Sequence, residues 1–354
     1  MRIAPAIALV GAAALGALAL RRIKARSFQD KVVIITGGSR GLGLAMARRL
    51  ADEGAKLVLL ARTDADLRNA EDLIAARGAD VVSIPCDVSD QAQVEAAIAL
   101  VIERFRRIDV LVNNAGVIQI GPVDNMGMHD FENAMAVHFW GPLFTMLEVI
   151  PHMRRQGGGR IVNIASIGGK VAVPHLAPYC ASKAALVGLS DAMRSELARD
   201  GIKVTTVCPW LMRTGSVYNV EVKGRHEREF AAFATAASIP GLTVQIDRAA
   251  RKIIEACRRG SPRLVMAVWG KAASFANELT PGVIAALQNF ANRLLPKPNF
   301  TDGDFPRTGW QSRSTLAPQP LMRIARVAAL RNNELRHALR EGRRVTEAPS
   351  LAGK

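Results

Sequence analysis

Two side chains in the stretch PYCASK could act together as an acid and a cation. Tyr179 is one of only two tyrosines in the chain, and Lys183 follows it by four residues. Residues four apart share one face of a helix, so a helix here would place the ammonium beside the phenol. A tyrosine titrates at about 10, and a neighbouring positive charge stabilises the phenolate and lowers that pKa. The pair is therefore a candidate for moving a proton at a carbonyl or an alcohol.

A serine upstream could complete such a site. Ser166 ends the apolar run RIVNIAS. Its hydroxyl could donate a hydrogen bond to a substrate oxygen, a contact that strengthens as negative charge builds on that oxygen. Each residue also has an ordinary explanation, because Ser166 could cap a loop and Lys183 could lie on a solvated helix face. The secondary-structure elements around these residues decide between the catalytic and the ordinary explanation.

Seven short apolar runs recur along the chain, with helical patterns between them. The runs are Val32–Thr36, Lys56–Ala61, Val81–Pro85, Ile108–Asn114, Arg160–Ser166, Lys203–Pro209 and Pro262–Ala267. Continuous apolar runs are typical of strands buried on both faces. The helical patterns cover Leu42–Glu53, Asp64–Arg77, Gln91–Arg106, Phe131–Arg155, Ala177–Asp200 and Asp247–Arg259. This alternation predicts an α/β fold, a doubly wound, Rossmann-like parallel sheet with helices on both faces.

The first run opens into a glycine-rich turn and then a helix, VVIITGGSRGLGLAMARRL. Glycines at 37, 41 and 43 let the backbone pass close to a ligand, and the helix points its first amides at that ligand. Such a site suits a pyrophosphate. A glycine triad alone is weak evidence, because tight turns also need glycine, but the strand before it and the helix after it strengthen the motif. The Lys-Ser/Thr pair of a P-loop is missing from this stretch.

The end of the second run bears on which dinucleotide would bind. An acidic residue at this point accepts hydrogen bonds from the ribose 2′-hydroxyl of NAD. This chain has Ala61 followed by Arg62, and the glycine turn adds Arg40. Two cations favour a 2′-phosphate, and hence NADP(H), although each arginine could instead be a solvated loop residue.

Several motifs together resemble the short-chain dehydrogenase/reductase family from about residue 28 to about residue 270. They are TGGSRGLG at 36–43, CDVSD at 86–90, NNAG at 113–116, Ser166, YCASK at 179–183 and CPWLMRT at 208–214. They stand in the order that the family has. The resemblance implies a dinucleotide lying across the ends of the strands and a reaction that interconverts a carbonyl and an alcohol.

The resemblance also implies roles for individual residues. Tyr179 would be the general acid in reduction and the general base in oxidation, Lys183 would hold the nicotinamide ribose, and Asp87 would contact the adenine. Thr214 matches the residue that contacts the carboxamide. The cofactor-binding residues that we predict are Gly37, Ser39, Arg40, Gly41, Leu42, Gly43, Arg62, Asp87, Val88, Asn114, Ala115, Gly116, Tyr179, Lys183, Pro209 and Thr214.

Two residues depart from the family pattern. His138 stands where the family has an asparagine that helps to hold a water on the catalytic lysine. An imidazole can donate or accept a hydrogen bond, so we count His138 with the catalytic residues as part of a proton relay. Trp210 replaces a glycine after Pro209, and its bulk is expected to reshape the entrance to the nicotinamide pocket.

Composition limits the other classes. The 354-residue chain is 49% hydrophobic and carries a formal charge of +16, of which residues 1–31 hold +5 and residues 297–354 hold +6. Without an aromatic-interleaved basic face or a zinc-finger pattern, nucleic acid is a poorer explanation of this charge than anionic lipid. The four cysteines have no metal-like spacing and fit a reducing compartment. The six histidines form no HExxH-like cluster, so no metal site is predicted.

The N-terminus predicts a membrane anchor. The run Ile3–Leu20 carries no charge and is followed at once by RRIKAR. A spanning helix needs about 20 apolar residues, and the basic cluster would keep its side of the membrane cytoplasmic. A secretory signal peptide is the competing interpretation, because Ala17-Leu18-Ala19 offers small residues for cleavage. We therefore expect a single-pass protein with its catalytic domain on the cytoplasmic side.

The chain divides by composition into five parts. We expect a membrane anchor with its basic flank over residues 1–26 and the catalytic domain over 27–270. A helical extension over 271–295, a Pro-rich linker over 296–320 and a basic helical tail over 321–354 would follow. Within the tail, a helix is predicted from Leu321 to about Glu341.

The segment Leu211–Leu242 is where the resemblance implies a mobile substrate cover. It contains the apolar run EFAAFATAASIPGL, which favours a lipophilic ketone, aldehyde or secondary alcohol as the substrate. A non-catalytic, NADP-binding, membrane-associated scaffold or sensor is the alternative function, and a nucleic-acid binder is a third that rests on charge alone. The resemblance implies a homodimer or a homotetramer.

Overall fold

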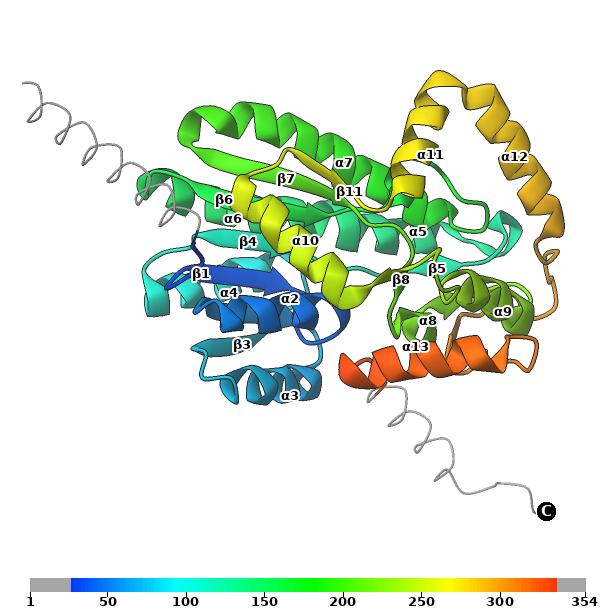
Figure 1. Cartoon of the computed structure of the whole chain (residues 1–354), viewed down its shortest axis with the longest axis horizontal. Coiled ribbons are helices and arrows are strands. Elements are labelled where there is room, and N and C mark those ends of the chain that lie inside the picture. Colours follow the sequence, from blue (N-terminus) through cyan, green and yellow to red (C-terminus); the bar gives the residue numbers. More distant parts are fainter. Residues whose placement is uncertain (1–26, 336–354) are drawn as a thin grey trace, which may run out of the picture.

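The computed structural model describes residues 27–335, which form a central parallel sheet between two layers of helices (Figure 1). Its seven strands lie in the order β11-β7-β6-β4-β1-β2-β3, and every neighbouring pair is parallel. The strands are β1 (Val32–Thr36), β2 (Lys56–Ala61), β3 (Val81–Pro85), β4 (Val110–Asn113), β6 (Gly159–Ile164), β7 (Ile202–Cys208) and β11 (Arg263–Val265). Each matches a predicted apolar run to within two residues at either end, so the doubly wound sheet is confirmed.

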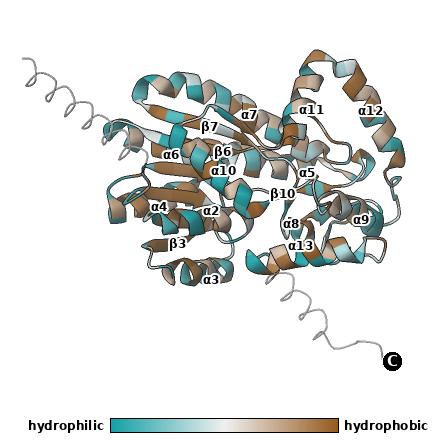
Figure 2. Cartoon of the chain, viewed as in Figure 1, coloured by the Kyte–Doolittle hydropathy of each residue, from teal (hydrophilic) through white to brown (hydrophobic). Residues whose placement is uncertain are grey.

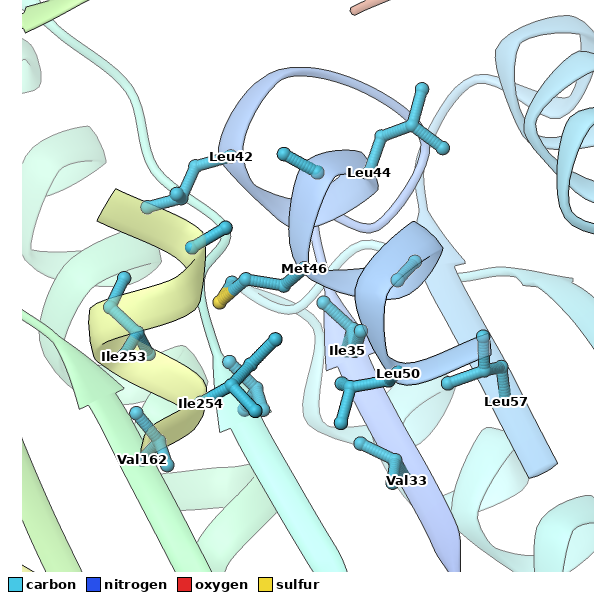
Figure 3. Packing of buried hydrophobic residues seen from close by; sticks show 14 of the residues in the cluster. Val33, Ile35, Leu42, Leu44, Met46, Leu50, Leu57, Val162, Ile253 and Ile254 are labelled. Carbon is cyan, nitrogen blue, oxygen red and sulfur yellow. The ribbon is translucent and has the colours of Figure 1, made fainter. Parts of the chain in front are cut away.

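Each face of the sheet has its own helices and its own core. One face carries α2 (Gly41–Asp52), α3 (Asp64–Ala75) and α10 (Ile246–Arg259), and the other carries α4 (Gln91–Phe105), α6 (Gly141–Arg155) and α7 (Ala177–Leu197). Figure 3 shows how α2 and α10 meet over the sheet: Met46 points toward Ile253 and Ile254, above Ile35 of β1. Because the strands are covered on both sides, most strand residues are apolar.

The long helical stretch Met128–Arg155 is not α-helical throughout. It consists of α5 (Met128–Met135), a π-helical turn (Ala136–Trp140) and α6. Within residues 27–335, this is the one stretch whose length and composition would allow it to cross a membrane, and half of its apolar window is buried. The buried residues of α6 belong to the core beneath the sheet, so the stretch serves here as a core helix.

The remaining elements gather beyond the carboxyl ends of the strands (Figure 1). The short strands make two small sheets, β8 (Met212–Arg213) with β10 (Val244–Gln245), and β5 (Gln119–Ile120) with β9 (Glu221–Val222) and β12 (Arg307–Thr308). The helices are α8 (Ser216–Asn219), α9 (His226–Ala236), α11 (Val268–Leu279), α12 (Pro281–Leu294) and α13 (Gln319–Arg331). The Pro-rich stretch around β12 runs back along this region instead of leaving the domain.

Helices α11 and α12 form a hairpin that projects from the body and carries hydrophobic stretches (Figures 1 and 2). Large apolar side chains stand exposed along both helices, among them Phe275, Leu287 and Phe290. In contrast, α13 packs against α9 and β8.

The prediction for the C-terminal helix was wrong at one end. It ends at Arg331 instead of continuing to about Glu341, and Asn333 has a left-handed backbone with a φ of 58°. Asparagine tolerates that conformation and commonly ends helices, which explains the stop. The predicted membrane anchor, residues 1–26, and the tail beyond Leu335 lie outside the described residues.

The contact between α2 and α10 yields a stability prediction. Replacing Ile253, which is 1% exposed, with alanine should lower the free energy of unfolding by about 2–5 kcal/mol, because a cavity opens in the core that α2 and α10 share. Leu100→Ala on α4, where the side chain is 51% exposed, should change it by no more than about 0.5 kcal/mol. Denaturant unfolding of both variants measures the difference. Equal losses of unfolding free energy in the two variants would show that the contact between α2 and α10 contributes no more to stability than an exposed side chain.

Candidate active site

The glycine turn joins β1 to α2 and could not be built from larger residues. Gly37 has a φ of 62°, and a Cβ there would come within 2.9 Å of the Ala115 Cα. A Cβ on Gly43 would lie 2.1 Å from the carbonyl oxygen of Gly37. The first turn of α2 is therefore packed closely against the turn that follows β1.

A second loop is tied to the same strand end. The Thr36 hydroxyl accepts hydrogen bonds from the backbone N–H groups of Asn114 and Ala115, at 2.9 and 3.0 Å. The Asn114 amide donates to the carbonyl oxygens of Thr36 and Gly37, both at 3.1 Å. The NNAG stretch and the glycine turn are thus held as one unit, as a wall of a cofactor cleft requires.

Buried polar side chains hold the neighbouring elements in register. Asn113 of β4 donates to Asn163 of β6 at 2.9 Å, and Asn163 donates to Ser190 of α7 at 2.9 Å. Thr145 of α6 donates to Asn113 at 2.7 Å. All four are almost fully buried and form a continuous chain of hydrogen bonds, so two strands and two helices are fixed just before the site begins.

Ser166, Tyr179 and Lys183 meet at the carboxyl end of β6. Ser166 follows that strand, and its Oγ accepts the Gly168 N–H at 3.0 Å and is hydrogen-bonded to the Tyr179 phenol. Both Tyr179 and Lys183 lie on α7, with the Lys183 Nζ 5.8 Å from the centre of the Tyr179 ring. The Lys183 ammonium also donates to the carbonyl oxygen of Ile164 at 2.8 Å. The three predicted residues are therefore together.

Burial sets the charge states of this group and corrects one expectation. It raises the pKa of Tyr179 to about 12, against the opposing effect of the Ser166 hydrogen bond. It lowers the pKa of Lys183 to about 7. The expected lowering of the tyrosine pKa by the lysine is thus outweighed, because both groups lose water. In this state the phenol is protonated and ready to donate, while the lysine is near its titration point.

His138 lies in the π-helical turn and bridges two elements of the site. Its Nε2 accepts the Val117 N–H at 3.1 Å, so the ring proton is on Nδ1, which lies 2.8 Å from the Ser182 hydroxyl. Ser182 in turn donates to the carbonyl oxygen of Tyr179 at 3.0 Å. Burial, with the nearby Lys183 charge, lowers the pKa of His138 well below its ordinary value. The imidazole is therefore a neutral bridge that positions the tyrosine, and its part in a proton relay stays a prediction.

One cavity of about 630 Å³ runs over these residues. Sixteen of the predicted residues line it: Gly37, Ser39, Arg40, Leu42, Arg62, Asp87, Val88, Asn114, Ala115, Gly116, His138, Ser166, Tyr179, Lys183, Pro209 and Thr214. The other two, Gly41 and Gly43, stand behind its wall in the first turn of α2. Trp210 also lines the cavity, braced by a 2.8 Å hydrogen bond from its ring N–H to the carbonyl oxygen of Leu242.

Some residues of the cavity wall were not predicted from the sequence. Asp66 lies in the first turn of α3 and is 4% exposed. It lines the end of the cavity at which Arg40 and Arg62 also lie. At the other end, the His175 Nδ1 lies 2.9 Å from a Glu229 carboxylate oxygen, within hydrogen-bond distance. Asp66 could have been suspected because it is close in sequence to Arg62, although the two lie on different elements, Arg62 just after β2 and Asp66 in α3. The pair could not, since 54 residues separate its members.

The family profile described as short chain dehydrogenase matches residues 31–223. The chain belongs to the short-chain dehydrogenase/reductase family. Members bind a nicotinamide cofactor, and the residues present fit one, because the glycine turn leaves a cradle that a Cβ would fill.

Relatives in this family include oxidoreductases from several bacteria. An uncharacterized oxidoreductase of Mycobacterium tuberculosis is 32% identical over 298 residues, which are 82% of this chain and 83% of the relative. Levodione reductase of Leifsonia aquatica is 39% identical over 195 residues, 54% of this chain and 73% of that protein. The crystal structure of a short-chain dehydrogenase from Streptomyces avermitilis covers 76% of this chain and 98% of its own, with a TM-score of 0.64 and 29% identity.

The charge states of the site predict a pH dependence. Carbonyl reduction should slow as the pH rises through about 7, where Lys183 loses the positive charge that stabilises Tyr179 as it gives up its proton. Initial rates across the neutral range measure this. Lys183→Arg, which stays charged, should be slower but lack the inflection. His138→Asn should keep it, because the imidazole is already neutral. An inflection that disappears in His138→Asn would assign the titration to the histidine.

Proposed function

We propose that the protein is an NADP(H)-dependent oxidoreductase that interconverts a carbonyl and a secondary alcohol on a lipophilic substrate, with Tyr179 as the general acid and base. One observation carries this proposal. The Ser166–Tyr179–Lys183 group, in which Ser166 and Lys183 are buried and Tyr179 is partly exposed, stands in the wall of the same cavity as the glycine turn. Membership of the short-chain dehydrogenase family supports the oxidoreductase class.

Each residue of the group has a distinct task in the reduction. The cofactor, when bound, supplies the hydride. Ser166 donates a hydrogen bond to the substrate oxygen, and Tyr179 gives that oxygen its phenolic proton. Lys183, held by the Ile164 carbonyl, stabilises the phenolate that results. In the oxidation the same groups act in reverse order, and the bridge through His138 and Ser182 keeps the tyrosine in place.

The preference for NADP(H) is supported by the two arginines. Arg40 and Arg62 both line the cavity at the end of β2, where no acidic residue follows Ala61 directly. Arg62 lies 3.9 Å from the Asp87 carboxylate, which partly offsets its charge. Arg40 instead bonds the neutral amide oxygen of Asn219 at 3.2 Å. The acid that interacts with it is Glu334, whose pKa burial raises to about 7, so Arg40 is the stronger candidate for a 2′-phosphate.

The substrate class is supported by the far end of the cavity. Apolar side chains dominate there, and they come from the loop before α7, from the Trp210 loop and from α9 and its end: Val171, Val173, Leu176, Trp210, Leu211, Ala232, Phe233, Ala236 and Ala237. Such a wall suits an apolar molecule with one reacting oxygen. Relatives named as ketoacyl reductases and as levodione reductase are consistent with a carbonyl substrate.

Replacing the acid tests the enzyme class against a non-catalytic cofactor-binding protein. Tyr179→Phe should lower the rate of NADPH oxidation by about 10²–10⁴-fold with whichever hydrophobic carbonyl the wild type reduces, because the proton donor is lost. A spectrophotometric screen over hydrophobic and small polar carbonyls provides the measurement. If wild type and variant are equally slow with all of them, the scaffold or sensor hypothesis is favoured. Activity confined to small polar carbonyls would refute the lipophilic substrate.

The cofactor preference has its own test. Arg40→Ala should lower kcat/KM for NADPH about tenfold, the loss of roughly 1.4 kcal/mol expected for one charge-assisted contact. The same change should leave kcat/KM for NADH within about twofold. Arg104→Ala, which removes an exposed arginine paired with Asp80 on the far side of the sheet, serves as the control. Equal losses with both cofactors would contradict a 2′-phosphate site at Arg40.

Attachment to a membrane through residues 1–26 is part of the same proposal. The uncharged run Ile3–Leu20 and the basic cluster behind it support a single-pass anchor with the catalytic domain on the cytoplasmic side. The anchor would then hold the catalytic domain beside the membrane in which a lipophilic substrate dissolves.

Fractionation of cells tests the anchor. The full chain should sediment with membranes and resist a high-salt wash, since an apolar span does not depend on charge. A chain without residues 1–26 should be recovered in the soluble fraction. A mature protein whose N-terminal mass shows cleavage near residue 19 would instead favour the signal peptide.

A further inference from the structure

Four residues beyond α13, Asn332–Leu335, reach back to the glycine turn although about 290 residues of chain separate them. The carbonyl oxygen of Asn332 accepts the Gly41 N–H at 2.9 Å. The Asn333 side chain donates to the carbonyl oxygen of Ser39 at 3.0 Å and accepts from Asn69 of α3 at 2.9 Å. This segment, the C-terminal clasp, therefore holds the turn that is expected to bind phosphate.

The same clasp is bonded to the opposite side of the cofactor region. The Glu334 carboxylate accepts the Gly215 N–H at 2.6 Å, and its backbone carbonyl accepts from the Asn219 side chain at 3.0 Å. Gly215 follows Thr214 in the loop between β8 and α8, and Thr214 lines the cavity together with Ser39. The clasp thus spans from one wall of the cavity to the other. Asn219 also bonds Arg40, so the clasp is connected to the predicted 2′-phosphate site.

Both walls are shaped to admit the clasp. A Cβ on Gly41 would come within 3.0 Å of Glu334 Oε1, and a Cβ on Gly215 would come within 2.7 Å of the Glu334 Cβ. Glu334 is 4% exposed, and Leu335 packs in an apolar cluster with Val217 and Tyr218. A buried carboxyl is costly unless bonded, and burial raises the pKa of Glu334 to about 7. Burying Glu334 costs free energy, and the two residues that it touches, Gly41 and Gly215, have no side chain in its way. We therefore interpret its contact with both loops as a specific feature of the fold.

We propose that the C-terminal clasp locks the dinucleotide in place by tying the glycine turn to the Gly215 loop, so that the cofactor leaves only when the clasp opens. The proposal rests on the proposed function, because it assumes that a nicotinamide dinucleotide binds between these two walls. It assigns Glu334 and Asn333 as positioning residues, since they contact the loops and not the reacting atoms. The clasp lies beyond residues 31–223, the part that matches the family profile.

Two variants of the full chain open the clasp in different ways. Glu334→Ala removes the bond to Gly215, and Asn333→Gly keeps the left-handed backbone but removes the bonds to Ser39 and Asn69. Glu334→Gln retains an oxygen that can accept the Gly215 N–H and serves as the conservative variant. Glu196→Ala, on the exposed face of α7, is the matched control.

The dissociation rate of NADPH is the primary measurement. The complex is mixed with excess NADP⁺, and the loss of bound NADPH fluorescence is followed by stopped flow. Glu334→Ala and Asn333→Gly should each release NADPH about tenfold faster than the wild type, whereas Glu334→Gln and Glu196→Ala should stay within about twofold. Amide hydrogen exchange of the free protein should rise at residues 39–43 and 213–216 in the first two variants only.

The outcomes separate the clasp from the proposed function. If NADPH binds and is released at one rate by all the proteins, the clasp proposal is overturned while the cofactor site stands. Faster exchange in both loops without faster release likewise overturns it, because the clasp then shapes the fold but not the release. If no nicotinamide dinucleotide binds to the wild type, the proposed function fails and the lock fails with it.

Discussion

The burial of the Lys183 ammonium beside Tyr179 is the interaction on which the site depends. A pKa lowered from 10.5 to about 7 corresponds to a cost on the order of 5 kcal/mol for charging this lysine inside the fold. The protein meets that cost by fixing the surroundings: Ile164 offers its carbonyl, and α7 is bonded to β6 through Asn163 and Ser190. A site that holds a desolvated cation near its titration point needs a rigid support, and the core on both faces of the sheet supplies it.

His138 shows how one unusual residue can be accommodated in such a support. It replaces an asparagine of the family pattern, yet both of its ring nitrogens have protein partners, the Val117 N–H and the Ser182 hydroxyl. The π-helical turn brings its ring edge-on to Tyr179, with 5.5 Å between the ring centres. The histidine therefore acts through Ser182 on the helix that carries the acid. Trp210 is accommodated similarly, by a hydrogen bond to Leu242.

Much of this architecture could be predicted because it is local in the sequence. The strands are continuous apolar runs, the glycine turn adjoins its strand and its helix, and Tyr179 and Lys183 are one helical turn apart. What could not be predicted depends on distant contacts or on burial. The clasp joins Asn333 to Ser39, and no periodicity in the sequence predicts that contact. The directions of the Tyr179 and Lys183 pKa values follow from desolvation, which spacing alone cannot give. The early end of α13 at Asn332–Asn333 carried a signal, since asparagine favours helix ends, but the basic, loosely periodic residues beyond it masked that signal.

Under the two proposals, the reaction takes place at a rigid end of the cofactor cleft, and the clasp opens and closes the end that binds the phosphates. A crystal structure of the protein with NADP⁺ tests this account most directly. It should show the nicotinamide ribose within hydrogen-bond distance of the Tyr179 hydroxyl and the Lys183 Nζ, with the phosphates between the glycine turn and the Gly215 loop. A dinucleotide bound elsewhere, or bound with its nicotinamide away from Tyr179, would contradict the assignment of Tyr179 as the proton donor.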